Sequence, residues 1–343
     1  MKIAVYTIAL NEEKHVERWY ESAKDADYLL IADTGSTDKT IKIAKKLGIN
    51  VVKISVKPWR FDDSRNAALA ALPDDIDYCI SMDMDETLSE GWREHLEKMT
   101  SKQVEYKFNV TWRDEAEEVV DVFFINNRIH SRHGFRWRYF IHESLVTDRL
   151  EDYTTEFCEG LEVSHHPDRE KSREQYSQMI EDAYKEYKNS RFHIYQGMQL
   201  MSFSRFEEAA NVWRSFLKLD EKIVTFEIAS AWRLLYKCSQ DTQLKYLKKS
   251  LKIMKTRETY LDLAIHYYKK DNWRKCFKYS RLGLDIKLKP SSLFTNKFAH
   301  GYLLENLYYA SKYNKKIFKL SKKPRRRPNV ESAIAHNFKL FND

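Results

Sequence analysis

The first half of the chain alternates apolar, β-prone runs with amphipathic segments, and this alternation limits the folds that it can adopt. KIAVYTIAL precedes EKHVERWYESAKD, and the pattern continues through YLLIADT, VVKIS and DYCISM, each followed by an amphipathic stretch. Continuous apolar strands separated by helices are typical of a parallel sheet that helices cover on both faces. The first half is therefore predicted to be an α/β domain with a mostly parallel, Rossmann-like sheet.

Polar residues follow three of these predicted strands directly: NEE at 11–13, DTGSTD at 33–38 and DMDE at 83–86. Ligands of open parallel sheets bind at the carboxyl ends of the strands. If the strand continued through Asp83 and Asp85, both carboxylates would lie on one side and repel each other unless a positive group lay between them. A divalent cation such as Mg²⁺ or Mn²⁺, bound also to a diphosphate, would offset this repulsion.

The pattern changes twice in the rest of the chain. From about residue 104, shorter β-prone runs with basic and aromatic residues between them are expected to complete the sheet and wall the site. After SHHPDR, segments rich in Lys, Leu, Tyr and Ala indicate helices. We therefore expect domains at 1–170 and 171–320, followed by a basic segment with a short helix at 321–343.

Two segments of the second half resemble each other. Aligning Gly197 with Ala264 and Ala209 with Cys276 gives an offset of 67 residues in both cases. This is close to twice the ~34-residue period of tetratricopeptide helical hairpins. An all-α helical-repeat domain is predicted, and an irregular helical bundle is the alternative.

The formal charge of +8 conceals an uneven distribution. Residues 1–170 contain 23 Lys+Arg against 34 Asp+Glu, net −11, whereas residues 171–343 contain 36 against 17, net +19. A strongly positive half attracts polyanions. Its lysines and arginines, between which aromatic residues are interleaved, can neutralise phosphates and release their counterions.

Cysteine usage and hydropathy exclude several classes of protein. The four cysteines form no CxxC pair, which indicates neither a disulfide framework nor a cysteine zinc site and fits a reducing compartment. No segment approaches the ~20 apolar residues of a membrane span, and the apolar N-terminal stretch is interpreted as a buried strand with no export signal. We expect a cytoplasmic protein of a bacterium, or of a phage in a bacterial host.

Four motifs occur in a fixed order: TIALNEE, IADTGSTDKT, DDSRNAAL and SMDMDE. In order and spacing they resemble the motifs of family 2 glycosyltransferases with the GT-A fold, over about residues 1–166. With its helical second half, the chain is most similar to bacterial and phage enzymes of this family that have tetratricopeptide-type C-terminal domains, a group that includes peptide glycosyltransferases. The resemblance implies transfer with inversion from a nucleotide-sugar, with a family preference for UDP.

The resemblance also implies roles on the nucleotide side. Asn11 and Glu12 would lie beside the nucleotide, Asp33 would accept hydrogen bonds from the base or ribose, and Arg65 would meet phosphate or stabilise the aspartates. Each segment also has a local alternative. NEE can cap the following helix, and DTGSTD can form a turn and a helix start.

For the metal, the resemblance implies that Asp83 contacts ribose or the cation and that Asp85 binds Mn²⁺ or Mg²⁺. It places a histidine ligand at His165, which is favoured over His166 because it shares strand parity with Val163. The sequence HHPD departs from the family here, since relatives often have an aromatic residue and a glycine.

For the acceptor side, the resemblance implies an acidic general base in YFIHESL, which contains His142 and Glu143. Glu143 is the candidate base, and a buried His–Glu structural pair is the alternative. The metal would offset charge on the departing nucleoside diphosphate while Glu143 deprotonates the acceptor.

The acceptor is the least determined part. Nucleic acid, such as hydroxymethylated phage DNA, ranks ahead of a peptide or protein, and an acidic surface glycopolymer ranks third. A different class is a nucleic-acid-binding helical scaffold with an inactive transferase domain, although the intact motif residues argue against it. A phosphatase or nuclease would not explain NEE and DTGSTD.

In the basic segment KKPRRRPN, Pro324 and Pro328 favour an extended strap over a helix.

Overall fold

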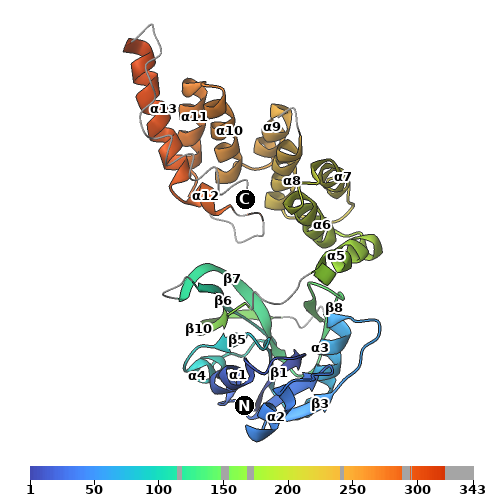
Figure 1. The fold of residues 1–343 in the computed structure, drawn as a ribbon. Coiled ribbons are helices and arrows are strands. Elements are labelled where there is room, and N and C mark those ends of the chain that lie inside the picture. The colour runs from blue at the N-terminus through green and yellow to red at the C-terminus, as the bar shows by residue number, and fades with distance from the viewer. Residues whose placement is uncertain are drawn as a thin grey trace. The chain divides into compact units, whose positions relative to one another are not determined.

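The structure is a computed structural model, and it describes residues 1–113, 118–147, 154–167, 174–239, 243–287, 294 and 296–320. The chain divides into two compact units, unit 1 (Met1–Ala183) and unit 2 (Tyr184–Asp343) (Figure 1). The division lies within α5 (Glu174–Tyr187). The boundary predicted near residue 170 and the basic segment predicted at 321–343 lie outside the described residues.

Unit 1 contains an eight-stranded sheet in the order β3-β2-β1-β4-β7-β6-β10-β5. The first four strands in chain order are β1 (Ile3–Ala9), β2 (Tyr28–Asp33), β3 (Asn50–Lys53) and β4 (Tyr78–Ser81). β1 pairs in parallel with both β2 and β4, and β2 pairs in parallel with β3. The predicted α/β domain with a mostly parallel sheet is therefore confirmed.

The other half of the sheet is mixed. It contains β5 (Glu86–Leu88), β6 (Gln103–Arg113), β7 (Glu118–Ser131) and β10 (Thr155–His165). β7 runs antiparallel to both β4 and β6, β6 is parallel to β10, and β5 is antiparallel to β10. A separate two-stranded sheet joins β8 (Phe135–Arg138) and β9 (Ser144–Thr147). β6 to β10 correspond to the β-prone runs predicted after residue 104. Only β8 and β9 are short as predicted, because β6, β7 and β10 are longer than β1 to β4.

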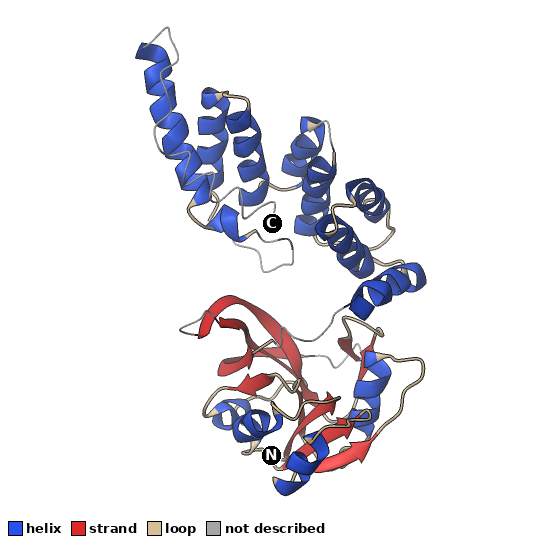
Figure 2. Ribbon diagram, in the orientation of Figure 1, coloured by secondary structure: helices blue, strands red, loops and turns tan. Residues whose placement is uncertain are grey.

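Helices cover both faces of the sheet in unit 1 (Figure 2). They are α1 (Val16–Ala23), α2 (Thr40–Lys46), α3 (Phe61–Ala70) and α4 (Trp92–Leu96). Successive residues of β1 enter different cores, since Ile3 and Val5 pack with Trp19, whereas Ala4 and Tyr6 pack in a second cluster. A strand that is buried on both faces must be apolar throughout, which explains the continuous run in the sequence.

Unit 2 contains helices, paired along the chain. Their bounds are α6 (Ser190–Ser202), α7 (Phe206–Phe216), α8 (Thr225–Cys238), α9 (Leu244–Ile253), α10 (Arg257–Lys269), α11 (Trp273–Leu284), α12 (Lys297–His300) and α13 (Leu303–Leu320). Gly197 and Ala264 lie in the first helices of two such pairs, and Ala209 and Cys276 lie in the second helices. The helical C-terminal region is confirmed, and its tetratricopeptide identity stays a prediction.

Close approach explains the glycine in the first of these pairs. A Cβ atom at Gly197 of α6 would lie 2.5 Å from the Trp213 ring of α7, and Trp213 is fully buried. The two helices can therefore pack at this distance only without a side chain at residue 197.

Among the described helices, none is long and apolar enough to cross a membrane.

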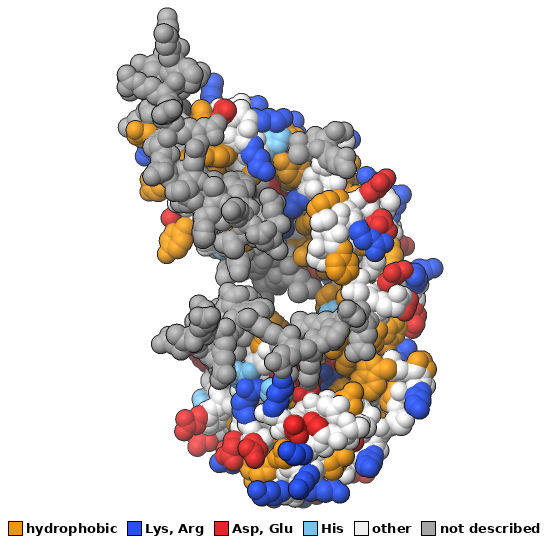
Figure 3. Space-filling model, viewed as in Figure 1, with side chains coloured by type: hydrophobic (Ala, Val, Ile, Leu, Met, Phe, Trp, Pro, Cys, Tyr) orange, Lys and Arg blue, Asp and Glu red, His pale blue; other side chains and the backbone are white. Residues whose placement is uncertain are grey.

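Positive side chains of the second half are visible on one face of unit 2 (Figure 3). On the face of unit 2 drawn in Figure 3, Lys and Arg side chains of the described helices lie among acidic and hydrophobic ones. On this face the described residues do not gather their charge into a single patch.

Candidate functional site

The carboxyl ends of β1, β2 and β4 meet at one edge of the sheet because the three strands are parallel neighbours. Asn11 follows β1, Asp33 ends β2, and Asp83 and Asp85 follow β4. The sheet topology therefore brings these predicted site residues to the same edge.

Asn11 and Asp33 tie two of these strand ends together. Asn11 has a positive φ of 55°, which asparagine tolerates, and its Oδ1 accepts a hydrogen bond from the Thr37 N–H at 2.8 Å. The Asn11 N–H donates to Ser36 Oγ at 2.9 Å. The Asp33 carboxylate accepts from the N–H groups of Gly35 and Ser36 at 3.2 and 3.1 Å, so the turn expected at DTGSTD is present.

The acidic residues after Asn11 contact the start of α2. The Glu12 N–H donates to Thr40 Oγ1 at 2.7 Å, and Glu13 Oε2 accepts from the Lys39 N–H at 2.9 Å. α1, the helix that NEE was expected to cap, begins after His15, and the His15 side chain makes no capping hydrogen bond. NEE therefore helps to fix the β2–α2 connection against the end of β1.

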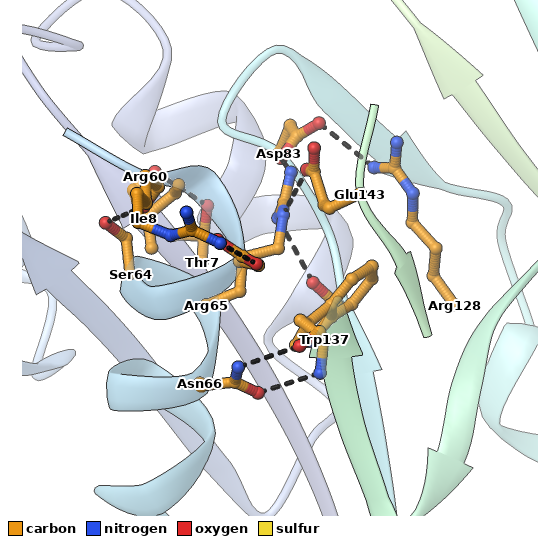
Figure 4. A network of polar contacts seen from close by, with 12 residues as sticks. Thr7, Ile8, Arg60, Ser64, Arg65, Asn66, Asp83, Arg128, Trp137 and Glu143 are labelled. Carbon is orange, nitrogen blue, oxygen red and sulfur yellow. Dashed lines mark hydrogen bonds and ion pairs between the residues drawn. The ribbon is translucent and has the colours of Figure 1, made fainter. Parts of the chain in front are cut away.

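Arg65, on α3, is the centre of the site (Figure 4). Its guanidinium donates to Glu143 Oε1 and to Asp83 Oδ1, both at 2.6 Å, and to Ser81 Oγ at 3.2 Å. The guanidinium also lies over the Trp137 ring, 5.1 Å from its centroid. Arg65 is buried. Its guanidinium joins two predicted site residues, Asp83 and Glu143, that are 60 residues apart in the sequence.

Arg128, on β7, is a second cation at the same carboxylate. Its Nη1 lies 3.0 Å from Asp83 Oδ2 and 3.3 Å from Glu86 Oε1, and Glu86 Oε2 accepts from the Asp83 N–H at 2.8 Å. Sequence reasoning missed both Arg128 and the role of Glu86. The available signal was a lone arginine in FFINNRIHS, but only the pairing of β7 with β4 brings it to this edge.

The ionisation of these groups follows from their partners. Burial alone would raise the pKa of Asp83, but Arg65 and Arg128 outweigh it and hold that pKa far below its usual range. The same two arginines lower the pKa of the buried Glu143. Burial and the neighbouring Asp83 charge raise the pKa of Glu86 to about 7. The site therefore holds anionic Asp83 and Glu143 at neutral pH.

The two aspartates after β4 face different partners. β4 ends at Ser81, so the strand does not continue through Asp83 and Asp85 as the parity argument required. Both carboxylate oxygens of Asp83 accept from arginines, whereas Asp85 Oδ2 lies 3.2 Å from His165 Nε2. In the structure, arginines offset the charge of Asp83, and His165 faces Asp85.

His165 and His166 both contact Asp85. The His165 ring packs against Phe108, and its hydrogen bond to Asp85 outweighs burial and raises the pKa of the imidazole. His166 donates its backbone N–H to the Asp85 carbonyl at 2.8 Å, and its Nε2 lies 3.1 Å from Thr87 Oγ1.

The donor types at Asp85 and His165 fit a divalent cation. A carboxylate oxygen and an imidazole nitrogen are ligands that Mn²⁺ accepts, and Mg²⁺ takes carboxylates together with phosphate oxygens and water. Within the described part of the chain, no group of three or more His, Cys, Asp or Glu side chains is arranged to hold a metal ion. A cation held by these two residues would take its remaining ligands from phosphates and water.

The segment that carries Glu143 is held by α3. Asn66 donates from Nδ2 to the Trp137 carbonyl at 2.9 Å and accepts from the Trp137 N–H at 2.7 Å (Figure 4). Tyr139 and His142 both have positive φ, at 78° and 49°. Such strain in non-glycine residues persists only where the surrounding structure imposes it. The surrounding structure therefore holds the backbone at His142 and Glu143 in one conformation.

Comparison with known proteins identifies this domain. Residues 4–158 match the family model Glycosyl transferase family 2. An uncharacterized glycosyltransferase of Rickettsia bellii is 34% identical over 103 residues, which cover 30% of this chain and 34% of that protein. One from Rickettsia conorii is 34% identical over 97 residues, 28% of this chain and 33% of that protein. The chain spans about a third of the length of these curated relatives.

Solved structures give partial likenesses. Glucosyl-3-phosphoglycerate synthase from Mycobacterium tuberculosis, in complex with Mn²⁺, UDP and glucosyl-3-phosphoglycerate, is 26% identical; the match covers 32% of this chain and 44% of that chain, with a TM-score of 0.27. S. aureus TarS is 12% identical; the match covers 84% of this chain and 56% of that chain, with a TM-score of 0.37. Scores this low support no detailed comparison, and the family model is what identifies the domain. Residues 4–158 thus match the glycosyl transferase family 2 model, and this stretch contains most of the GT-A-like, mostly parallel sheet.

Proposed function

We propose that the chain is a metal-dependent glycosyltransferase that moves a sugar from a nucleotide-sugar, with UDP as the nucleotide, to a macromolecular acceptor with inversion. One observation carries the proposal. In a family 2 domain, Arg65 joins Asp83 and Glu143 at the edge where the parallel strands end. This arrangement sets fixed positive charge beside carboxylates in the position where such sheets bind ligands.

On the donor side, Asn11, Glu12 and Asp33 are proposed to line the nucleotide pocket. Their side chains or backbone groups already form the connected turn after β1 and β2, so the pocket would be preformed. Asp83 would act from its clamp between Arg65 and Arg128, close to the ribose and diphosphate.

Asp85 and His165 are proposed to hold Mn²⁺ or Mg²⁺, with Asp83 beside them. A bound cation would offset the charge that develops on the departing nucleoside diphosphate. His165 must be neutral to serve as a ligand, so a bound cation would replace the hydrogen bond between His165 Nε2 and Asp85 Oδ2, which lie 3.2 Å apart. These residues lie on the connection after β4 and at the end of β10.

Glu143 is proposed to accept the proton of the acceptor hydroxyl as it attacks the anomeric carbon. Its lowered pKa keeps it ionised at neutral pH, which is the state that a general base requires. Arg65 holds the carboxylate in one orientation, and the fixed backbone at His142 holds the segment.

The acceptor is proposed to be polyanionic, with nucleic acid ahead of peptide. The charge of the second half, net +19, supports this ranking because it would attract phosphates. Hydroxymethylated DNA offers both a hydroxyl nucleophile and a phosphate backbone.

The test is sugar transfer from radiolabelled UDP-sugars with Mn²⁺ to plain DNA, hydroxymethylated DNA and peptides, in parallel. Asp85→Ala is compared with Glu90→Ala, since Glu90 is an exposed carboxylate in the same stretch of chain. We expect transfer or donor hydrolysis that EDTA and Asp85→Ala abolish and Glu90→Ala preserves. Neither transfer nor hydrolysis of any UDP-sugar with the wild-type chain would contradict the proposal.

A further inference from the structure

The charged side chains that α11 exposes to solvent are all positive. Arg274, Lys275, Lys278 and Arg281 are all exposed, and the helix Trp273–Leu284 contains no acidic residue. These side chains line an open groove of about 510 Å³, and its lining within the described part of the chain is Asn272, Arg274, Lys275, Phe277, Lys278 and Arg281. A concave surface with four cations, and no acidic residue among the described residues that line it, is suited to an anion.

The spacing of these cations suits a chain of anions rather than a single ion. Arg274, Lys278 and Arg281 are four and three residues apart, so they share one side of the helix. Their Cα atoms are separated along the axis by about 6 and about 4.5 Å. A ligand that lies along α11 would therefore meet three positive charges over about 10 Å.

An aromatic cluster adjoins the groove. Phe277 lines the groove and stacks on Tyr308 of α13, with ring centroids 5.0 Å apart. Tyr309 packs edge-on against Tyr308 at 5.1 Å and is 63% exposed. Cations that follow a backbone, next to an exposed aromatic ring, are the pattern of proteins that bind single-stranded nucleic acids without reading sequence.

We propose that the α11 groove binds single-stranded nucleic acid, with Arg274, Lys278 and Arg281 on phosphates and Tyr309 stacked on a base. The role of the bound strand as acceptor rests on the proposed function, whereas the binding itself does not. An acidic peptide would match the charges, but it would give Tyr309 no flat ring to stack on. The arginine forks match the geometry of phosphate oxygens.

α9 provides a matched control for net charge. It carries Lys245, Lys248, Lys249 and Lys252, all exposed, and no acidic residue or arginine. Lys249 Nζ lies over the Trp232 ring of α8, 4.1 Å from its centroid. Removing two charges from α9 changes the charge of unit 2 as much as removing two from α11, so a difference between the variants reports on the groove.

The experiment is fluorescence anisotropy of a labelled 20-nucleotide oligo-dT with the full chain, from 50 to 200 mM salt. The double variant Arg274→Gln with Arg281→Gln is compared with Lys248→Gln with Lys252→Gln. Glutamine preserves helix propensity, and circular dichroism checks that both variants fold. We expect the α11 variant to bind at least about tenfold more weakly and its slope of log K against log salt to shrink by about 1.4, whereas the α9 variant stays within about twofold of wild type.

Equal weakening in both variants would overturn the proposal in favour of net charge alone. Absence of salt-dependent oligo-dT binding by the wild-type chain would also overturn it. Polyglutamate that competes as well as oligo-dT at equal charge would assign the groove to acidic peptides instead, and Tyr309→Ala should then have no effect. UDP binding with Mn²⁺ is measured on the same samples, so loss of that signal with retained DNA binding would refute only the proposed function.

Discussion

Both units bury ion pairs, but the two sets differ in their place in the fold. In unit 1, Arg65 links Asp83 and Glu143 beyond the ends of parallel strands, and Asp83 retains 32% of its side-chain exposure. In unit 2, Arg233 of α8 faces Asp262 of α10 at 3.4 Å, with both side chains at least 94% buried. The first set is open to a ligand, and the second joins two helix pairs. Buried charge alone therefore does not mark a functional site, and only the first set lies at the carboxyl ends of parallel strands, where open sheets bind ligands.

The largest effect is expected for Glu143→Gln. Removal of the proposed base should lower transfer by about 10²- to 10⁴-fold, because a positioned proton acceptor contributes that much. Radiolabel transfer measures the loss, and calorimetry of UDP binding shows whether the donor site survives. Glu90→Gln is the matched control on an exposed carboxylate. Transfer within tenfold of wild type would remove Glu143 from the mechanism.

Asp262→Ala tests the other side of the comparison. It leaves the buried Arg233 without its carboxylate and also removes the partner of Lys237 Nζ at 3.7 Å. Breaking a buried pair in this way costs about 3–5 kcal/mol, so unit 2 should lose that much unfolding free energy. Hydrogen exchange of the amides in α8 and α10 measures the change. UDP binding should be unaffected, and a loss of UDP binding would mean that this pair also serves the site.

The sequence predicted more of the site than of its electrostatics. Apolar strands and the polar residues after them were enough to bring Asn11, Asp33, Asp83 and Asp85 to one edge, because parallel neighbours end together. Arg128 was missed because the antiparallel pairing of β7 with β4 is a long-range contact that no local pattern specifies.

The directions of the two aspartates after β4 could not be predicted either. Strand parity applies only while the strand continues, and β4 ends at Ser81. In unit 2, Gly197 and Ala264, which the 67-residue offset aligns, both lie in first helices of their pairs, and the helical repeat itself stays a prediction. The pairing of Arg233 with Asp262 carries no sequence pattern that separates it from surface charges.

His130 makes the stability of unit 1 depend on pH. It is fully buried on β7, and its Nε2 lies 3.2 Å from the Tyr6 hydroxyl. Burial lowers its pKa to about 4. The unfolded chain, in which the pKa is about 6.5, then binds more protons, so stability falls as the pH drops from 6.5 to 4, by about 3 kcal/mol in all. Hydrogen exchange of the β4 and β7 amides across this range measures the slope. His130→Gln should flatten the slope of stability against pH. An unchanged slope would mean that groups other than His130 cause the pH dependence.

The smallest effect is expected for Asn66→Ala. This change removes two hydrogen bonds to the Trp137 backbone, and each contributes about 1 kcal/mol. We expect a loss of about 1–2 kcal/mol in unit 1 by thermal unfolding and a decrease in kcat of a few fold, because the segment before Glu143 loses its anchor. Asn66→Asp keeps the acceptor for the Trp137 N–H, so its stability and kcat should lie between those of wild type and Asn66→Ala. An activity loss as large as that of Glu143→Gln would mean that Asn66 acts directly on the substrate.

The most direct test of the account is calorimetric titration of UDP into the full chain with and without Mn²⁺, for wild type, Asp85→Ala and Asp262→Asn. We predict that Mn²⁺ strengthens UDP binding to the wild-type chain, that Asp85→Ala abolishes this dependence, and that Asp262→Asn leaves it intact. UDP binding that is indifferent to Mn²⁺, or that is unchanged in Asp85→Ala, would contradict the claim that the strand ends of unit 1 form a metal-dependent nucleotide-sugar site.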